Sequence, residues 1–430
     1  MNKYYSDFQS FINTLDPSRV SDIQFRTDAF NRFQTQGFPT IKDEDWRFTN
    51  LNPISKIHFQ LPDDNHVLIN DSIIEKNRIK DTIMIAVANG SIMIEKSDLN
   101  QLPKEIQIRN ISESDNAIYI INDGIHRLNT FNEWNRAFYN RGLQLEVANN
   151  CTFKTPIHIL FISSVPESKT VFHYRNSYDL GENSQVYIIE QYVSSAELNY
   201  LNNGVSEINI GENASLDHIN IHQESSAVFH VQSTLINQTK NSQLRSHHFN
   251  LNGQLIRNDI HLQLNGDGGS TTLYGLNLSK DQQLMDTNII VDHLKPDCVS
   301  TQLFKNILND HSKGVFNGLV IVEKDAQKTN ASQTNKNLLL SKNATMNSNP
   351  QLEINTDTVR CSHGSTTGAL EQESLYYLRS RGIDEMQAKI LLINGFVSEI
   401  IDSITHTEVR NGITGFVDSW LEMEVRIQDE

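Results

Sequence analysis

Turn-forming residue pairs recur at a nearly constant interval in the middle of this chain. The pairs begin at Asn183, Asn213, Asn241 and Gly269, so that successive pairs are 30, 28 and 28 residues apart. Each pair precedes a short run in which apolar and polar residues alternate, as in residues 216–221, and this alternation is the pattern of a strand. A repeat of this length that contains only strands predicts stacked coils, in which each coil buries its inner face against its neighbours.

This repeat favours a parallel β-helix over a β-sandwich, which is the main alternative because it too consists of short strands joined by turns. Hydrophobic residues make up only 38% of the 430 residues, which fits a mainly β body with many polar turns. Apolar residues at helical spacing predict helices at both ends of the chain. The expected regions are an N-terminal helical or mixed region (1–145), a β-helix core (146–368) and a C-terminal helical region (369–430).

Two helix boundaries follow from the sequence near the C-terminus. Helical spacing over residues 371–381 ends at Gly382, a residue type that suits the position after the C-terminus of a helix. Asp384 and Gln387 have the spacing of a capping pair, which predicts the start of the next helix.

Charge and cysteine content exclude several classes of protein. The chain carries 36 Lys and Arg residues against 52 Asp and Glu residues and shows no local basic patch, so we expect no nucleic-acid binding. Its three cysteines, Cys151, Cys298 and Cys361, are widely spaced and form neither a disulfide framework nor a zinc motif. The N-terminus lacks an apolar signal core, and the apolar stretch 157–162 is too short to span a bilayer. We therefore expect a cytoplasmic protein that does not enter a membrane.

Most familiar catalytic motifs are absent from the sequence. There is no GxxxxGK[ST] loop, so the chain is not expected to hydrolyse a nucleotide. The glycine-rich segment 266–270 lies between strands and predicts a tight turn. His218 and His222 are four residues apart, on one face of a strand, where they could bind a metal ion. Ordinary surface or interface histidines are the commoner case and are what we expect here.

Cys361 and His363 are the residues best suited to metal chemistry. In a strand, residues two apart face the same side, and both thiolate and imidazole bind iron. The alternative interpretation is a small buried thiol beside a histidine with a purely structural role at a junction between strand and helix. Taken alone, the pair favours that structural alternative.

The wider sequence reverses this preference. The segment Cys361-Ser362-His363-Gly364 is accompanied by a dense set of similar segments between about 290 and 405 and a sparser set near the N-terminus. These segments are 38–40, 44–47, 292–293, 304–305, 316–318, 326–329, 333–341, 350–354, 361–368 and 375–383. Together they resemble the SufB/SufD family of iron–sulfur cluster assembly proteins. The flanking residues Ser362 and Gly364 and the modest chain length favour the SufD type, because SufB-like chains commonly carry acidic residues beside this histidine.

The resemblance implies a fold and a function. It implies a right-handed parallel β-helix with helical ends, working as a non-enzymatic scaffold subunit of the SufBCD complex in iron–sulfur cluster assembly. Clusters usually take about four protein ligands, and this chain offers one local pair, so a transient cluster would be shared with SufB across their interface. His363 is then the first candidate for an iron ligand or base, and Cys361 is the second. A flavin remains open, although no motif supports one.

The resemblance also implies partners. A SufB-like paralogue would pair through the β-helix, and a SufC-like ATPase would dock on the C-terminal helices. A homodimer of the isolated chain remains open, as does the alternative that the chain is itself a SufB-like homodimeric cluster scaffold. The residues expected to dock the ATPase are Leu375, Tyr376, Leu378, Arg379 and Arg381.

Overall fold

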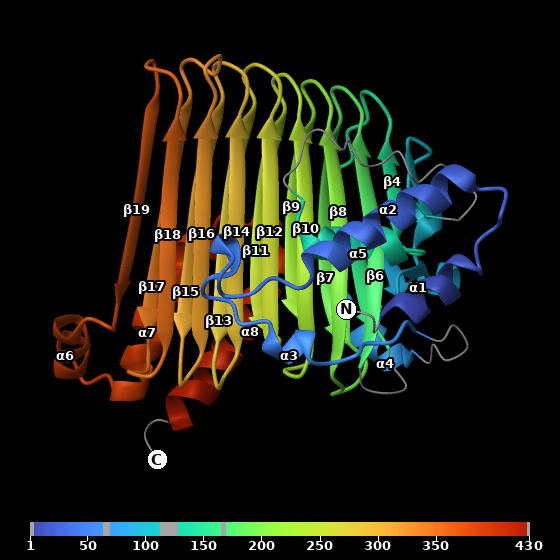
Figure 1. Cartoon of the computed structure of the whole chain (residues 1–430). Helices are drawn as coiled ribbons and strands as arrows, with labels where there is room; N and C mark the ends of the chain where they lie inside the picture. Colours follow the sequence, from blue (N-terminus) through green and yellow to red (C-terminus); the bar gives the residue numbers. More distant parts are fainter. Residues whose placement is uncertain (1–3, 63–68, 112–127, 165–168, 428–430) are drawn as a thin grey trace.

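Two long sheets face each other along the molecule (Figure 1). The structure is a computed structural model that describes residues 4–62, 69–111, 128–164 and 169–427. From β4 to β19 successive strands alternate between the sheets, and they pair in parallel within each sheet. Each coil therefore contributes one strand to each sheet. This arrangement is a parallel β-helix with helices at both ends of the chain, which confirms the predicted fold class and rules out the β-sandwich.

The first sheet contains the odd-numbered strands except β3, together with β2. In spatial order it consists of β19 (Arg360–Gly368), β17 (Asn330–Leu339), β15 (Val299–Leu308), β13 (Ser270–Ser279), β11 (Gln243–Asn252), β9 (Ser215–Gln223), β7 (Gln185–Ser194), β5 (Ile157–Ser163), β1 (Ile83–Ala88) and β2 (Ser91–Ile92).

The second sheet contains the even-numbered strands except β2, together with β3. In spatial order it consists of β18 (Thr345–Ile354), β16 (Lys313–Val322), β14 (Leu284–His293), β12 (Leu255–Leu264), β10 (Phe229–Gln238), β8 (Tyr200–Ile210), β6 (Thr170–Leu180), β4 (Leu143–Val147) and β3 (Ile106–Asn110).

The helices and short 3-10 turns occupy the two ends of the chain. They are α1 (Tyr5–Ile12), α2 (Val20–Gln36), η2 (Glu44–Trp46), α3 (Asn52–Ser55), α4 (Asp71–Asn77), η3 (Ile94–Lys96), η4 (Leu99–Gln101), α5 (Thr130–Phe138), α6 (Gln372–Ser380), α7 (Glu385–Ile401) and α8 (Thr407–Ile427).

The repeated turn residues explain the repeat in the sequence. Asn183, Asn213 and Asn241 have φ values of 56°, 57° and 54°, a left-handed conformation that Asn tolerates better than most residues. Their side chains also bond to one another: Nδ2 of Asn213 donates to Oδ1 of Asn183 at 3.1 Å, and Nδ2 of Asn241 donates to Oδ1 of Asn213 at 3.2 Å. Asparagine serves both effects at these three turns, and Gly268, Asp297 and Lys328 adopt the same left-handed conformation in the later coils.

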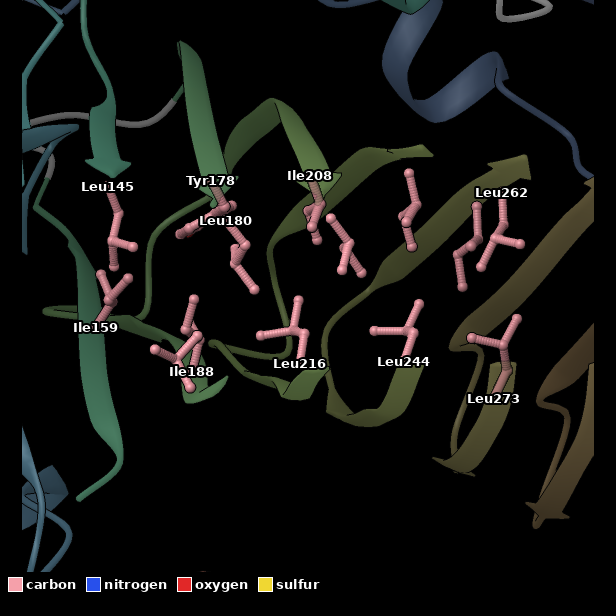
Figure 2. Packing of buried hydrophobic residues seen from close by; sticks show 14 of the residues in the cluster. Leu145, Ile159, Tyr178, Leu180, Ile188, Ile208, Leu216, Leu244, Leu262 and Leu273 are labelled. Atoms are coloured by element: carbon pink, nitrogen blue, oxygen red, sulfur yellow. The ribbon is translucent and has the colours of Figure 1, made fainter. Parts of the chain in front are cut away.

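Aliphatic side chains fill much of the space between the sheets. Figure 2 shows Ile188, Leu216 and Leu244 of the first sheet facing residues such as Ile208 and Leu262 of the second. Each of these side chains is at most 3% exposed, and burying such a side chain contributes roughly 1.5–3 kcal/mol. The stacked coils therefore share one continuous core.

An aromatic layer covers the outer face of the second sheet near its N-terminal end. In Figure 1, α2 and α5 lie across this face. Trp134 of α5 stacks on Phe33 of α2, with ring centroids 5.3 Å apart, and both belong to a buried cluster that includes Val171 and Leu201 of the sheet. This end of the β-helix is thus covered by helices on its outer face.

The segment around η2 is fixed to the same sheet by a buried arginine. Arg257 lies over the ring of Trp46, with its guanidinium carbon 3.9 Å from the ring centroid. Its Nη1 donates to Asp286 and to the carbonyl of Asp45, and its Nη2 donates to Asp259 at 2.7 Å. Because the charge is buried, these acceptors are needed to keep it stable.

Helices α7 and α8 cover the outer face of the first sheet. Their buried residues, among them Val397 and Trp420, pack in one cluster with Ile219 and Ile221 of β9. This packing reverses the expected faces of β9, because its isoleucines point outward to the helices. His218 and His222 then point into the β-helix and are only 1% and 0% exposed, so the expectation that they are surface or interface histidines is wrong.

Candidate functional site

The motif Cys361-Ser362-His363-Gly364 lies in β19, the last strand of the first sheet (Figure 1). Cys361 is paired with Ala331 of β17, and His363 is paired with Gln333. Gln333 is buried and donates to Oε1 of Gln302 in the preceding coil at 2.9 Å. His363 therefore continues an inward-facing row of side chains, and it is exposed because it belongs to the last coil.

One edge of β19 is open. The N–H of Arg360 donates to the carbonyl of Thr329, on the side of β17. Successive residues of a strand direct their N–H groups to opposite sides, so the N–H groups of Cys361, His363 and Ser365 point away from β17. Such a row of free donors and acceptors is a template for another strand.

The second sheet ends differently. The N–H of Thr345 donates to Ser312, and that of Asn355 donates to Val322, so the even-numbered residues of β18 direct their N–H groups outward. Pro350 is one of them and has no N–H, a placement typical of edge strands. The open end of the β-helix thus has a full row of donors on the sheet that carries His363 and an interrupted row on the other.

Partial burial raises the pKa of the Cys361 thiol above its usual value, and a hydrogen bond from the backbone of Ala331 opposes this shift. The thiol therefore stays protonated at neutral pH, whereas iron binds the thiolate. Within the described ranges, no third His, Cys, Asp or Glu lies close enough to complete a metal site with Cys361 and His363. The pair can supply two ligands, and the described part of the chain supplies no others there.

Helix α6 presents a different set of residues from the one predicted. Leu375 is 7% exposed and faces inward, whereas Tyr376 and Tyr377 are 76% and 57% exposed. Sequence reasoning did not include Tyr377, although two adjacent tyrosines on one short helix cannot both be buried by the same face. The remaining predicted residues lie close by: Leu378 is half-buried, and Arg379 and Arg381 are exposed.

Ion and ring contacts hold the exposed part of α6. Nη1 of Arg379 lies 3.1 Å from Oε2 of Glu385 in α7, and the guanidinium of Arg381 lies over the ring of Tyr377, 5.2 Å from its centroid. In Figure 1, α6 lies beside the open end of the β-helix rather than against the middle of a sheet. The two candidate surfaces, the edge of β19 and the tyrosines of α6, are therefore neighbours at one end of the molecule.

Comparison with known proteins identifies the family. Residues 161–396 match the family model described as the SufBD core domain of SUF system iron–sulfur cluster assembly, and residues 1–159 match the SufBD protein N-terminal region. The chain belongs to the SufBD family. The core match runs from within β5 through β19 and α6 into α7, so it includes both candidate surfaces.

Within this family the chain is SufD-like. It is 31% identical over 381 residues to an iron–sulfur cluster assembly SufBD family protein of Synechocystis, covering 85% of this chain and 84% of that protein. It is 35% identical over 238 residues to iron–sulfur cluster assembly protein SufD of Escherichia coli, covering 55% and 56% of the two chains. It is also 35% identical over 275 residues to the chloroplastic protein ABCI7 of Arabidopsis thaliana, covering 62% and 57%.

These relatives bear out the family expected from the motif around His363. None of the helices in the described ranges is both long and apolar enough to cross a membrane.

Proposed function

We propose that this chain is a non-enzymatic scaffold subunit of a cytoplasmic SufBCD-type complex. It pairs with a SufB-like paralogue and docks a SufC-like ATPase while an iron–sulfur cluster is assembled. The observation that carries this proposal is the open end of the β-helix, where the edge of β19 and the Cys361–His363 pair are both accessible.

The open end fits a second β-helix. Core residues there, including Met346, Leu352 and Cys361, are only partly buried, whereas core residues further along the β-helix are almost completely enclosed. A paralogue that placed its own last coil against this end would cover these side chains and bond to the free N–H groups of β19. Addition of a strand to an exposed edge is a common mode of protein recognition.

The ligand count supports a shared site. Cys361 and His363 supply two of the roughly four ligands that a cluster usually takes. The partner that covers β19 would supply the rest, and the incoming iron would favour the thiolate form of Cys361. The cluster is cargo in this scheme, held between the subunits until it is passed on.

The exposed face of α6 supports the docking of an ATPase. The chain has no phosphate-binding loop, so the energy for assembly comes from a partner. Tyr376 and Tyr377 give this face two large aromatic side chains, the residue type that most often dominates protein interfaces. Arg379 and Arg381 add positive charge beside them, and Leu375 holds the helix in place from within.

Co-expression with a SufB-like paralogue and a SufC-like ATPase tests the proposal. The three proteins should purify as one complex. The double variant Tyr376→Ala/Tyr377→Ala should lose the ATPase but keep the paralogue. His363→Ala should keep the complex but fail to accumulate the cluster absorbance, whereas the control His311→Ala, at an exposed turn of the same β-helix, should behave as the unmodified chain.

Two results would overturn the proposal. A paralogue that binds equally well when β19 is blocked would show that the open end is not the interface. A stable cluster on a homodimer of this chain alone would instead support the alternative function, a SufB-like scaffold.

A further inference from the structure

Three chemically reactive side chains meet inside the β-helix, far from the exposed motif. His222 ends the inward face of β9, Glu224 follows that strand directly, and His230 lies in β10. They are 0%, 1% and 0% exposed, and their ligand atoms all lie within 4.8 Å of one another. The cluster therefore sits at the corner where the chain passes from the first sheet to the second.

The two oxygens of Glu224 have different roles. Oε1 accepts hydrogen bonds from Nδ2 of Asn202 at 2.6 Å and from the hydroxyl of Tyr200 at 3.2 Å. Oε2 lies 2.5 Å from Nδ1 of His230 and 3.8 Å from Nδ1 of His222. Neutral donors thus fix one oxygen and orient the other towards both imidazoles.

The histidines are oriented by aromatic neighbours. Nε2 of His230 lies 3.0 Å from the hydroxyl of Tyr174, which leaves Nδ1 to face Glu224. The ring of His222 stacks on Tyr192, with centroids 4.9 Å apart and planes 11° apart. The hydrogen bonds to His230 and Glu224 are of the kind that orient metal-binding histidines and carboxylates.

The buried ring of His222 lacks the hydrogen bonds that such a group usually makes. Neither of its ring nitrogens has a hydrogen-bond partner among the described residues, although buried polar atoms are nearly always paired. A buried imidazole nitrogen without a hydrogen-bond partner is available to bind a metal ion.

We propose that His222, Glu224 and His230 form a binding site for one divalent transition-metal ion. Two imidazoles and one carboxylate form a ligand set that suits Zn²⁺ or Fe²⁺. In the ion-free chain, Glu224 and His230 share a hydrogen bond, and ligand bonds to the ion would replace it. A simple Glu224–His230 charge pair would account for these two residues but would leave both nitrogens of His222 unpaired.

Tyr174 connects the cluster with a nearby pocket. One side of this residue lines a pocket of about 570 Å³ between the N-terminal helices and the second sheet, together with Asn89 and Phe172. A narrow cavity behind the pocket shares these three residues and reaches Tyr192 and Asn202. Because Tyr192 and Asn202 contact His222 and Glu224, the pocket and the cluster are neighbours.

Cobalt(II) provides the test. The full-length chain is freed of metal with a chelator and then either titrated with Co²⁺ or produced in medium that contains Co²⁺. We expect one bound equivalent with visible d–d bands, displaceable by Zn²⁺, and no sulfur-to-metal charge-transfer band. The variant Cys361→Ser/His363→Ala should retain this equivalent, which separates the interior cluster from the exposed motif.

Variants locate the ion. His222→Gln and Glu224→Gln should each lower the Co²⁺ affinity by more than about 100-fold, and Tyr174→Phe should lower it by about 10- to 100-fold, as is usual when a residue that orients a ligand is removed. The control His218→Gln changes another buried histidine, one that lies 3.2 Å from Glu190, and should retain the ion.

The proposal is wrong if neither procedure yields a stoichiometric ion, or if His218→Gln weakens binding as much as His222→Gln does. Circular dichroism shows whether a variant has simply failed to fold. In that case, X-ray absorption of the unmodified chain decides: two imidazoles without sulfur support the site, and a sulfur ligand overturns it.

Discussion

The two ends of the β-helix are built differently. At the N-terminal end both sheets finish in a strand that runs antiparallel to its neighbour, β2 on β1 and β3 on β4, and helices cover the adjoining outer face of the second sheet. At the C-terminal end the sheets finish in parallel strands whose outer edges are open. The difference fits the proposed function, in which the N-terminal end serves the stability of the chain and the C-terminal end serves association.

Breaking the N-terminal cover should have the largest effect on the isolated chain. Trp134 is 1% exposed and packs between Phe33 and His173. Trp134→Ala should lower the free energy of unfolding by about 3–5 kcal/mol, because it removes a large buried side chain and leaves a cavity. Urea denaturation measures the change.

Tyr376→Ala, at the other end of the molecule, is the control for that experiment. Its side chain is largely exposed, so the free energy of unfolding should change by at most about 0.5 kcal/mol. Equal losses for the two variants would contradict the proposed division between the ends.

Blocking the open edge should have the next largest effect, and it should appear only with the partner present. Ser365→Pro removes an N–H that points away from β17 and should weaken binding of the SufB-like paralogue by about 100-fold, or about 2.7 kcal/mol. Ser365→Ala removes the hydroxyl but keeps the N–H, so it should bind normally. Binding measured by calorimetry would refute the interface if both variants behaved alike.

The N-terminal cover should also weaken in acid. Burial lowers the pKa of His173 to about 3, whereas an unfolded histidine titrates near 6.5. Below pH 6.5 the unfolded chain therefore binds a proton that the folded chain does not. For this one histidine, the free energy of unfolding decreases by about 1.4 kcal/mol for each unit by which the pH is lowered.

His173→Gln tests this contribution. It should make the loss of stability between pH 6.5 and pH 5 smaller by about 2 kcal/mol than in the unmodified chain, which follows from the same slope. Urea denaturation at several pH values gives the comparison, and an unchanged pH dependence would show that His173 is not buried in its neutral form.

The smallest effect is expected from His363→Ala in the isolated chain. This side chain is exposed on the last coil, so the free energy of unfolding should change by no more than about 0.5 kcal/mol. A thermal melt is sufficient to measure it. A loss above about 1 kcal/mol would mean that His363 has a structural role, as the alternative interpretation of the motif held.

The repetitive part of the fold could be predicted because its signals are local. The spacing of the turn residues predicted the coils, and each predicted turn precedes a strand of the first sheet. Near the C-terminus, Gly382 has a φ of 88° directly after α6, and Oδ1 of Asp384 accepts from the N–H of Gln387 at 2.9 Å. Both boundaries confirm predictions that depended on single residues.

The faces of the strands could not be predicted in the same way. Alternation shows that His218 and Ile219 lie on opposite faces but does not show which face is inside. Helices α7 and α8, which lie far along the chain, pack against Ile219 and Ile221 of β9, so these isoleucines lie on the outer face of the sheet. The interior cluster of His222, Glu224 and His230 was missed for this reason, and only the spacing of its first histidine pointed to it.

The pairing of strands that are distant in the sequence could not be predicted either. Residues 83–88 form β1 and pair with residues 157–162 of β5, so strands of the first sheet begin in the stretch where the sequence showed only a mixed pattern. Nothing local in residues 83–88 specifies that partner. At the exposed motif, by contrast, the sequence indicated His363 and Cys361 directly, because the resemblance depends on those residues themselves.

The regular stacking of the coils gives the molecule a fixed unit of length. Neighbouring strands are about 4.8 Å apart, and five such steps in the first sheet separate β9, which carries His222, from β19, which carries His363. The coils thus act as a spacer of about 24 Å. Deleting one coil in register would shorten it by about 4.8 Å and leave the surfaces at both ends unchanged.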